Sequence, residues 1–130
     1  MKSMLLSLIA LVVSWQSGCS ESTQSNAKDI FISIEVESAF QNDLVTLLLD
    51  GKTLLESRVT TNYTVSLAWS GGLQKLSNDN HMLYFAVIEY TAHNTYEIDL
   101  KDDTSTVTIN FDKSTKQIRF QQYKGILLRD

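Results

Sequence analysis

Apolar and polar side chains alternate with a period of two along most of the chain from Asp29 onward. The most regular stretch is residues 106–111, where Val107, Ile109 and Phe111 alternate with two threonines and an asparagine. Successive side chains of a β-strand point to opposite faces of its sheet, so this period predicts strands that are buried on one face. No stretch keeps the i, i+3, i+4 spacing of an amphipathic helix over three turns. We therefore expect an all-β protein.

Short extended segments recur along the chain and are joined by polar turns. About seven or eight such strands predict a two-sheet antiparallel β-sandwich, or a partly open barrel. The order of hairpin, loop, long strand and hairpin loosely resembles immunoglobulin-like and carbohydrate-binding sandwiches, although the Cys–Trp–Cys core of immunoglobulin domains is missing. The predicted extended segments are residues 30–36, 44–49, 52–61, 63–69, 81–90, 96–100, 106–111, 117–121 and 126–128.

The dipeptide Asp50-Gly51 lies between two apolar runs and predicts a β-hairpin. A type I′ turn needs positive φ at both central positions, which Gly51 adopts without strain. A two-residue turn would place Leu47 opposite Leu54, whereas a three-residue loop would place Leu48 opposite Leu54. The sequence leaves these two registers open.

The segment 81–90 is the most apolar predicted strand, and both of its faces are apolar. A two-layer sandwich buries only one face of each strand. We expect Leu83, Phe85 and Val87 to line the core. The opposite face is covered either by the predicted loop 73–80 or by a partner protein, and it consists of Met82, Tyr84, Ala86 and Ile88.

Glu35 and Glu37 share one face of the first predicted strand. Residues two apart on a strand have Cα atoms ~7 Å apart, a separation compatible with the paired carboxylates of glycosidases. Every strand offers that spacing, however. We expect a solvated acidic face, paired with Arg58 or Arg119.

The N-terminal residues have the features of an export signal. Residues 4–15 are apolar apart from two serines, which is too short to span a bilayer but suits the apolar part of a signal peptide. Ser17, Gly18 and Cys19 follow directly. This stretch resembles the lipobox of bacterial lipoproteins, with Gln16 where an aliphatic residue is usual.

The resemblance implies that residues 1–18 are a lipoprotein signal peptide and that Cys19 carries lipid. Residues 19–28 then form the lipidated cysteine and a polar tether, and residues 29–130 form a single domain. Ser20 stands where an aspartate would retain the protein in the inner membrane, so the expected location is the cell envelope, anchored in the outer membrane. An ordinary signal peptide with a free thiol and an uncleaved membrane anchor are the alternatives.

The domain has no sequence motif of an enzyme or of a nucleic-acid-binding protein. His81 and His93 are the only histidines and lie in no metal-ligand spacing, and no serine lies in a GxSxG elbow. A catalytic triad assembled from distant residues remains open, because triads are recognised by geometry. The net charge of −4 gives no reason to bind nucleic acid.

Carboxylates at one predicted turn are weak calcium candidates, namely Asp99, Asp102 and Asp103. Aspartate is also a favoured turn residue, so we expect no metal and no other cofactor.

Aromatic side chains are the remaining sign of binding, because they can stack on sugar rings or anchor a protein partner. The sequence thus favours a non-enzymatic envelope lipoprotein that binds an envelope protein. A carbohydrate-binding module is the alternative, and a small exported hydrolase is the third. The candidate contact residues are Trp69, Tyr84, Tyr90 and Tyr96, with Tyr63 and Tyr123 as further tyrosines.

Overall fold

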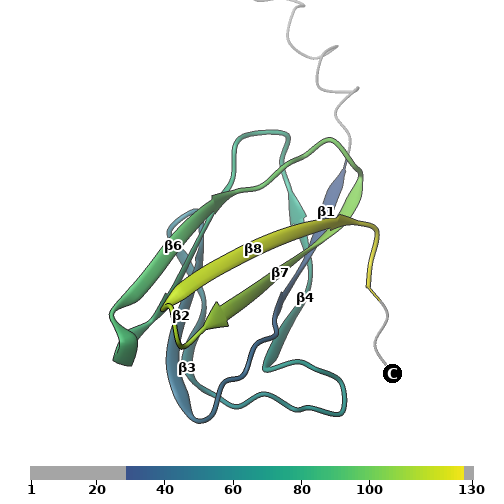
Figure 1. Cartoon of the computed structure of the whole chain (residues 1–130). Helices are drawn as coiled ribbons and strands as arrows, with labels where there is room; N and C mark the ends of the chain where they lie inside the picture. Colours follow the sequence, from purple (N-terminus) through teal and green to yellow (C-terminus); the bar gives the residue numbers. More distant parts are fainter. Residues whose placement is uncertain (1–28, 128–130) are drawn as a thin grey trace, which may run out of the picture.

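The alternating segments fold into two four-stranded β-sheets that pack face to face in the computed structural model, which describes residues 29–127 (Figure 1). Sheet A has the strand order β4-β1-β7-β8 and sheet B the order β3-β2-β5-β6, which confirms the predicted β-sandwich. The predicted signal peptide, Cys19 and the predicted tether lie outside the described residues. The strands are β1 (Ile30–Val36), β2 (Asp43–Leu49), β3 (Lys52–Val59), β4 (Trp69–Leu76), β5 (Met82–Val87), β6 (Ala92–Glu97), β7 (Thr104–Asp112) and β8 (Gln117–Lys124).

Inward-facing side chains of both sheets form one apolar core. On β5, Leu83, Phe85 and Val87 are fully buried, as their spacing predicts. Phe40, from the connection between β1 and β2, is also buried and packs its ring against those of Phe85 and Phe111, with centroids 6.2 and 6.1 Å away. The burial of Phe40 is not predicted from the sequence because Phe40 lies in a loop, where the period of two does not apply.

One strand pair departs from the predicted antiparallel arrangement. β1 pairs in parallel with β7 on one side and antiparallel with β4 on the other. Parallel neighbours need a long crossover, and here all of sheet B and β4 separate β1 from β7 in the sequence. Local alternation indicates which face of a strand is buried but not which strand lies beside it.

The turn at Asp50-Gly51 has positive φ at both residues, 53° and 82°, which confirms the predicted turn. A bulge in β3 next to this turn inserts one extra residue and places Leu47 opposite Leu55. Both predicted registers paired Leu54 across the hairpin, and both are therefore wrong.

β4 is the largest departure from the predicted segments. Residues 63–68 form turns rather than the predicted strand. β4 begins at Trp69 and continues through Gly71 and Gly72 into the segment predicted as a loop, 73–80, because β1 offers it an antiparallel partner. Gly71 is needed where it lies, since a Cβ there would come within 2.5 Å of the Trp69 ring.

The other boundaries shift by a few residues. β5 ends at Val87 and is followed by a 3₁₀ turn, η1 (Ile88–Tyr90), so the predicted strand 81–90 is too long. β6 starts before the predicted 96–100, and residues 126–127 form no strand. No helix among the described residues has the length and apolar character needed to cross a bilayer.

The acidic outer side predicted for β1 is wrong. Glu35 is only 5% exposed, and Ser33 on the same face is buried as well. β1 is a central strand with β4 and β7 on its two sides, so its outer side chains are sheltered by those of its neighbours. Of the two predicted partners, Arg58 instead pairs with Glu89.

Candidate functional site

The outer face of sheet B carries an apolar patch on its two central strands. Met82 begins the central strand β5 and Ile88 directly follows it, yet their side chains are 45% and 48% exposed. Tyr84 is half-buried, lies opposite Leu48 of β2 and stacks on the ring of His93 at 6.0 Å. We call this surface the β2–β5 face; it consists of Leu44, Leu48, Met82, Tyr84, Ala86 and Ile88 around the polar Thr46, and Ala86 is its one buried member.

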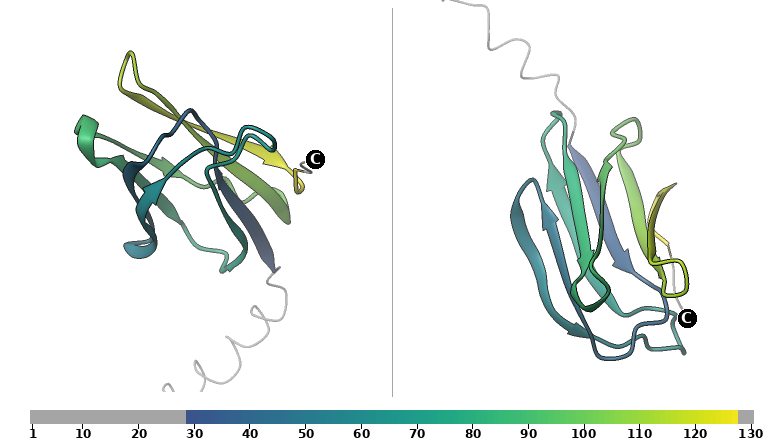
Figure 2. Two further views of the ribbon diagram at one scale, coloured as in Figure 1. Left: turned by 90° about the horizontal axis from the view of Figure 1, so that it is seen from below. Right: turned by 60° about the vertical axis from the view of Figure 1, so that its left-hand side comes forward.

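The predicted internal cover of the β2–β5 face is absent. The segment expected to provide it contributes instead to β4 of sheet A, where Leu76 joins the core and Leu73 is 58% exposed on the other side of the molecule. The connections between the sheets run around the ends of the sandwich, and no described segment crosses the outer side of sheet B (Figure 2). Within residues 29–127 the face is therefore left open.

Two charged residues, Arg58 and Glu89, border one end of this face and form an ion pair with each other. Arg58 donates to Glu89 at 2.6 Å and to the carbonyl oxygen of Asn42 at 3.0 Å. The second oxygen of Glu89 accepts the backbone N–H of Leu44 at 2.9 Å. The bond from Arg58 is the main cause of the lowered pKa of Glu89. A polar rim around an apolar centre is the usual organisation of a protein interface.

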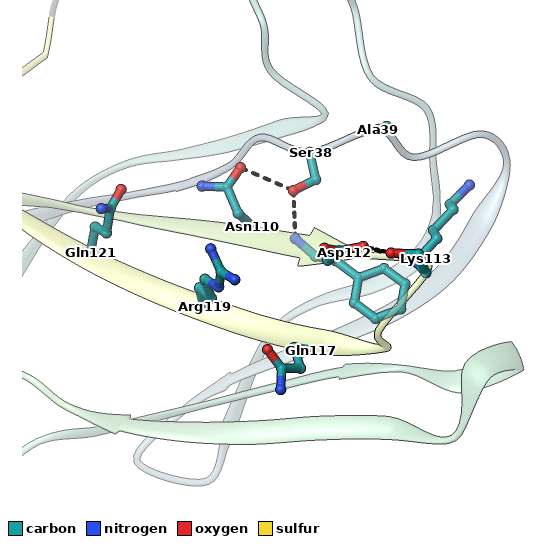
Figure 3. A pocket seen from close by; sticks show the side chains of 10 residues that line it. Ser38, Ala39, Asn110, Asp112, Lys113, Gln117, Arg119 and Gln121 are labelled. Carbon is teal, nitrogen blue, oxygen red and sulfur yellow. Dashed lines mark hydrogen bonds between the residues drawn. The ribbon is translucent and has the colours of Figure 1, made fainter.

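A polar hollow of about 550 Å³ lies on the opposite sheet, where the outer sides of β7 and β8 meet the loop after β1 (Figure 3). We call it the Arg119 hollow. Figure 3 shows Arg119 on β8 between Gln117 and Gln121, facing Asn110 of β7. The Asn110 amide is held in place, because it accepts a hydrogen bond from Ser38 Oγ at 3.0 Å and donates one to Glu37 at 3.1 Å.

Arg119 and Asp112 are the two charged groups around the hollow that form no ion pair among the described residues. Lys113 pairs with Asp43 at 3.1 Å, and this bond raises the pKa of Lys113. Asp112 accepts bonds from the hydroxyl and backbone N–H of Ser114 at 2.6 and 2.9 Å, which lower the pKa of Asp112. Of the two cations that line the hollow, Arg119 is thus the one without an ion-pair partner among the described residues.

A Ser–His–Asp arrangement occurs at the end of the sandwich where β4 leads into β5. His81 Nδ1 lies 2.6 Å from Asp50 Oδ2, and His81 Nε2 lies 3.3 Å from Ser77 Oγ. These are the contacts of a hydrolase triad. Asp50 also accepts the backbone N–H of Met82 at 2.9 Å, so the hairpin tip is tied to β5.

The protonation of His81 argues against catalysis at this arrangement. Nε2 lies closer to the carbonyl oxygen of Ser77, at 2.9 Å, than to its hydroxyl. Both ring nitrogens thus face acceptors, which favours the imidazolium, and the Asp50 bond raises the pKa of His81. An imidazolium cannot take the proton of a serine nucleophile. The Ser77 hydroxyl meanwhile donates to Asp79 at 3.1 Å.

The candidate aromatic residues do not gather at one site. The Trp69 ring packs against Gly71 and the core. Tyr84 lies on the outer side of sheet B, whereas Tyr90 packs edge-on against Phe111, with ring centroids 5.1 Å apart. Tyr96 stacks on Phe120 of β8 at 5.3 Å. The sugar-binding row of aromatic rings expected for a carbohydrate module is thus not assembled from these four residues.

The calcium candidates do not form a donor set either. Asp99 accepts the backbone N–H of Lys101 at 3.0 Å, which is a turn contact. In residues 29–127, no three histidine, cysteine or acidic side chains come close enough together to hold a metal ion. Asp102 and Asp103 lie in the loop that leads into β7.

The sequence analysis missed the Arg119 hollow, although its signal was present. Asn110, Gln117, Arg119 and Gln121 occupy outward positions of the two most regular alternating segments. Outward polar residues are ordinary on any sheet, so only the pairing of β7 with β8 and the position of the Ser38 loop distinguish them.

Comparison of the chain with protein-family models, with curated proteins and with solved structures found no match.

Proposed function

We propose that this protein is a non-enzymatic binding module of the cell envelope and that its ligand is another envelope protein. The observation that carries the proposal is the β2–β5 face, an apolar surface on two central strands that no described part of the chain covers. Contiguous exposed apolar patches on soluble domains commonly mark protein interaction sites. Tyr84 and Met82 are side chains of the types enriched in interfaces.

A protein partner suits this face better than a glycan does. The face is largely apolar and carries one half-buried aromatic ring, that of Tyr84, whereas sugar-binding sites combine aromatic platforms with polar groups that hydrogen-bond hydroxyls. The hydrolase alternative loses support because the His81 arrangement offers no general base.

The proposed location follows from the lipobox-like Ser17-Gly18-Cys19. A diacylglycerol group on Cys19 would hold the domain at a membrane surface, by the resemblance the outer membrane, within reach of a membrane-bound partner. Wild type and Cys19→Ala are to be compared by fatty-acid labelling and membrane fractionation. We expect label and membrane association in the wild type alone, and equal fractionation of the two without label contradicts the anchor.

The partner surface is tested by photo-cross-linking in membranes of cells that produce the full chain. A benzophenone amino acid replaces Ile88 on the β2–β5 face or, as the matched control, Leu73 on sheet A, which is similarly exposed. We expect a defined adduct with a second envelope protein from position 88 and none from position 73.

Adding Tyr84→Ser should abolish that adduct while the melting temperature of the domain changes little. Equal adducts from both positions, or none from either, contradict the proposal. An adduct of twice the mass of the chain also contradicts it, because the occupant would then be a second copy.

A further inference from the structure

We infer that the Arg119 hollow is a second binding site and that its ligand is a carboxylate-bearing sugar, as found in acidic glycans. This site lies on sheet A, on the other side of the molecule from the β2–β5 face, and does not depend on the function proposed there.

The positive charge of Arg119 favours an anionic ligand. Arg119 is exposed and has no described ion-pair partner, whereas Arg58, the other described arginine, is fully engaged with Glu89 and Asn42. A guanidinium presents parallel N–H donors that match the two oxygens of a carboxylate. Lys52, Lys116 and Lys124 likewise form no ion pair among the described residues, but of these unpaired cations only Arg119 lines the hollow.

The neutral groups of the hollow select for hydroxyls. Gln117 and Gln121 flank Arg119 along β8, and Asn110 faces it from β7 (Figure 3). Each side-chain amide offers both a donor and an acceptor, which is what a ring of hydroxyl groups requires. Asn110 is already oriented by Ser38 and Glu37, so less conformational freedom is lost when a ligand binds.

An aromatic platform adjoins the hollow. A second hollow of about 260 Å³ shares Ser38, Ala39 and Asn110 with the first and is lined by Tyr63. Tyr63 is 72% exposed, which is the largest exposure of any large apolar side chain among the described residues. Its ring can stack on the C–H face of a sugar unit next to the one whose carboxylate meets Arg119. An acidic peptide would use the guanidinium but has less need of the amides and the ring.

Isothermal titration of the full-length chain in detergent micelles tests this inference with three ligands. These are tetragalacturonate, a neutral galactose tetramer of equal length, and tetraglutamate. We expect tetragalacturonate alone to bind measurably. Arg119→Gln should weaken this binding at least about tenfold, as expected for the loss of a charge-assisted bidentate contact. Tyr63→Ala should weaken it as well.

Lys124→Gln is the matched control, because it removes one positive charge from the other end of β8 and should leave binding unchanged. All variants concern exposed side chains and should keep the wild-type melting temperature. The inference is overturned if the neutral tetramer or tetraglutamate binds as well as tetragalacturonate, if Arg119→Gln binds like the wild type, or if tetragalacturonate does not bind.

Discussion

The central strands β5 and β7 both bury their inner faces, but their outer faces differ in solvent exposure. On β7, the outward Thr106 and Thr108 are almost completely buried, at 0% and 1% exposure. On β5, the outward Met82 and the adjoining Ile88 are about half exposed. At Thr106 and Thr108 the polar outer face of β7 is closed within the domain, whereas at Met82 and Ile88 the apolar outer face of β5 is open to solvent.

The chain itself covers the polar face in part. Thr106 Oγ1 donates to the carbonyl oxygen of Gly125 at 2.8 Å and accepts the backbone N–H of Leu127 at 3.3 Å, so the residues after β8 fold back over β7. Longer side chains stand in the same cross-strand row, with Leu73 on β4 and Tyr123 on β8. Short hydroxyl side chains between taller neighbours become buried whatever their polarity. The polarity of a side chain on an outer face therefore does not predict how exposed to solvent that side chain is.

Truncating the inner face of β5 should have the largest effect. Phe85 is fully buried and contacts the ring of Phe40, so Phe85→Ala should reduce the free energy of unfolding by about 3–5 kcal/mol. Denaturant titration of the wild type and the variant measures this loss. A loss below about 1 kcal/mol would mean that the two sheets do not share the packed core described above.

The two threonines of β7 should respond in opposite directions to the same substitution. Thr106→Val removes two hydrogen bonds to the chain end and should destabilise the fold by about 1–2 kcal/mol. Thr108 Oγ1 is buried without a hydrogen-bond partner among the described residues, so Thr108→Val should stabilise the fold by about 1 kcal/mol. Changes of the same sign in the two midpoints would contradict this account of the polar face.

The contact of His81 with the tip of the β2–β3 hairpin should depend on pH. The Asp50 bond raises the pKa of His81 above 6.5 in the folded state. The stabilisation is therefore complete below the unfolded-state pKa and is lost as pH rises through the folded-state value. Because Asp50 is partly exposed, we expect a contribution of about 1 kcal/mol or less. Unfolding titrations between pH 5 and 9 should show this decline in the wild type, and His81→Gln should remove it. A decline that persists in the variant would have another origin.

A substitution on the open outer face of sheet B should have the smallest effect. Ile88→Ser should change the free energy of unfolding by no more than about 0.5 kcal/mol, because the side chain already lies half in solvent. Thermal unfolding of the full chain measures the change. A large destabilisation would show that some part of the protein covers Ile88 after all, and the contrast between β5 and β7 would fail.

The sequence predicted the inner faces well because burial on one side is what a period of two encodes. Val107, Ile109 and Phe111 are buried, and the positive φ of Gly51 follows from its turn. β4 was missed because a glycine pair ordinarily ends a strand, and its place beside β1 depends on contacts far away in the sequence.

The outer faces were predicted less well, because they depend on which strands become neighbours. Glu35 was expected in solvent and is buried, and the loop expected as one possible cover of Ile88 contributes to β4 instead and leaves Ile88 exposed. The Arg119 hollow likewise exists only once β8 pairs with β7 and the Ser38 loop closes over their end.

The position of β1 between β4 and β7 also sets the order in which the domain can form. The Ser38–Asn110 bond at the end of this pairing joins residues 72 positions apart, whereas the β2–β3 hairpin needs only its own turn. Contacts that close long loops form slowly, because the entropy of closure is lost before the contact forms. β1, the first of the described strands to be synthesised, must therefore wait for β7, and until then it exposes a row of isoleucines to any chaperone nearby.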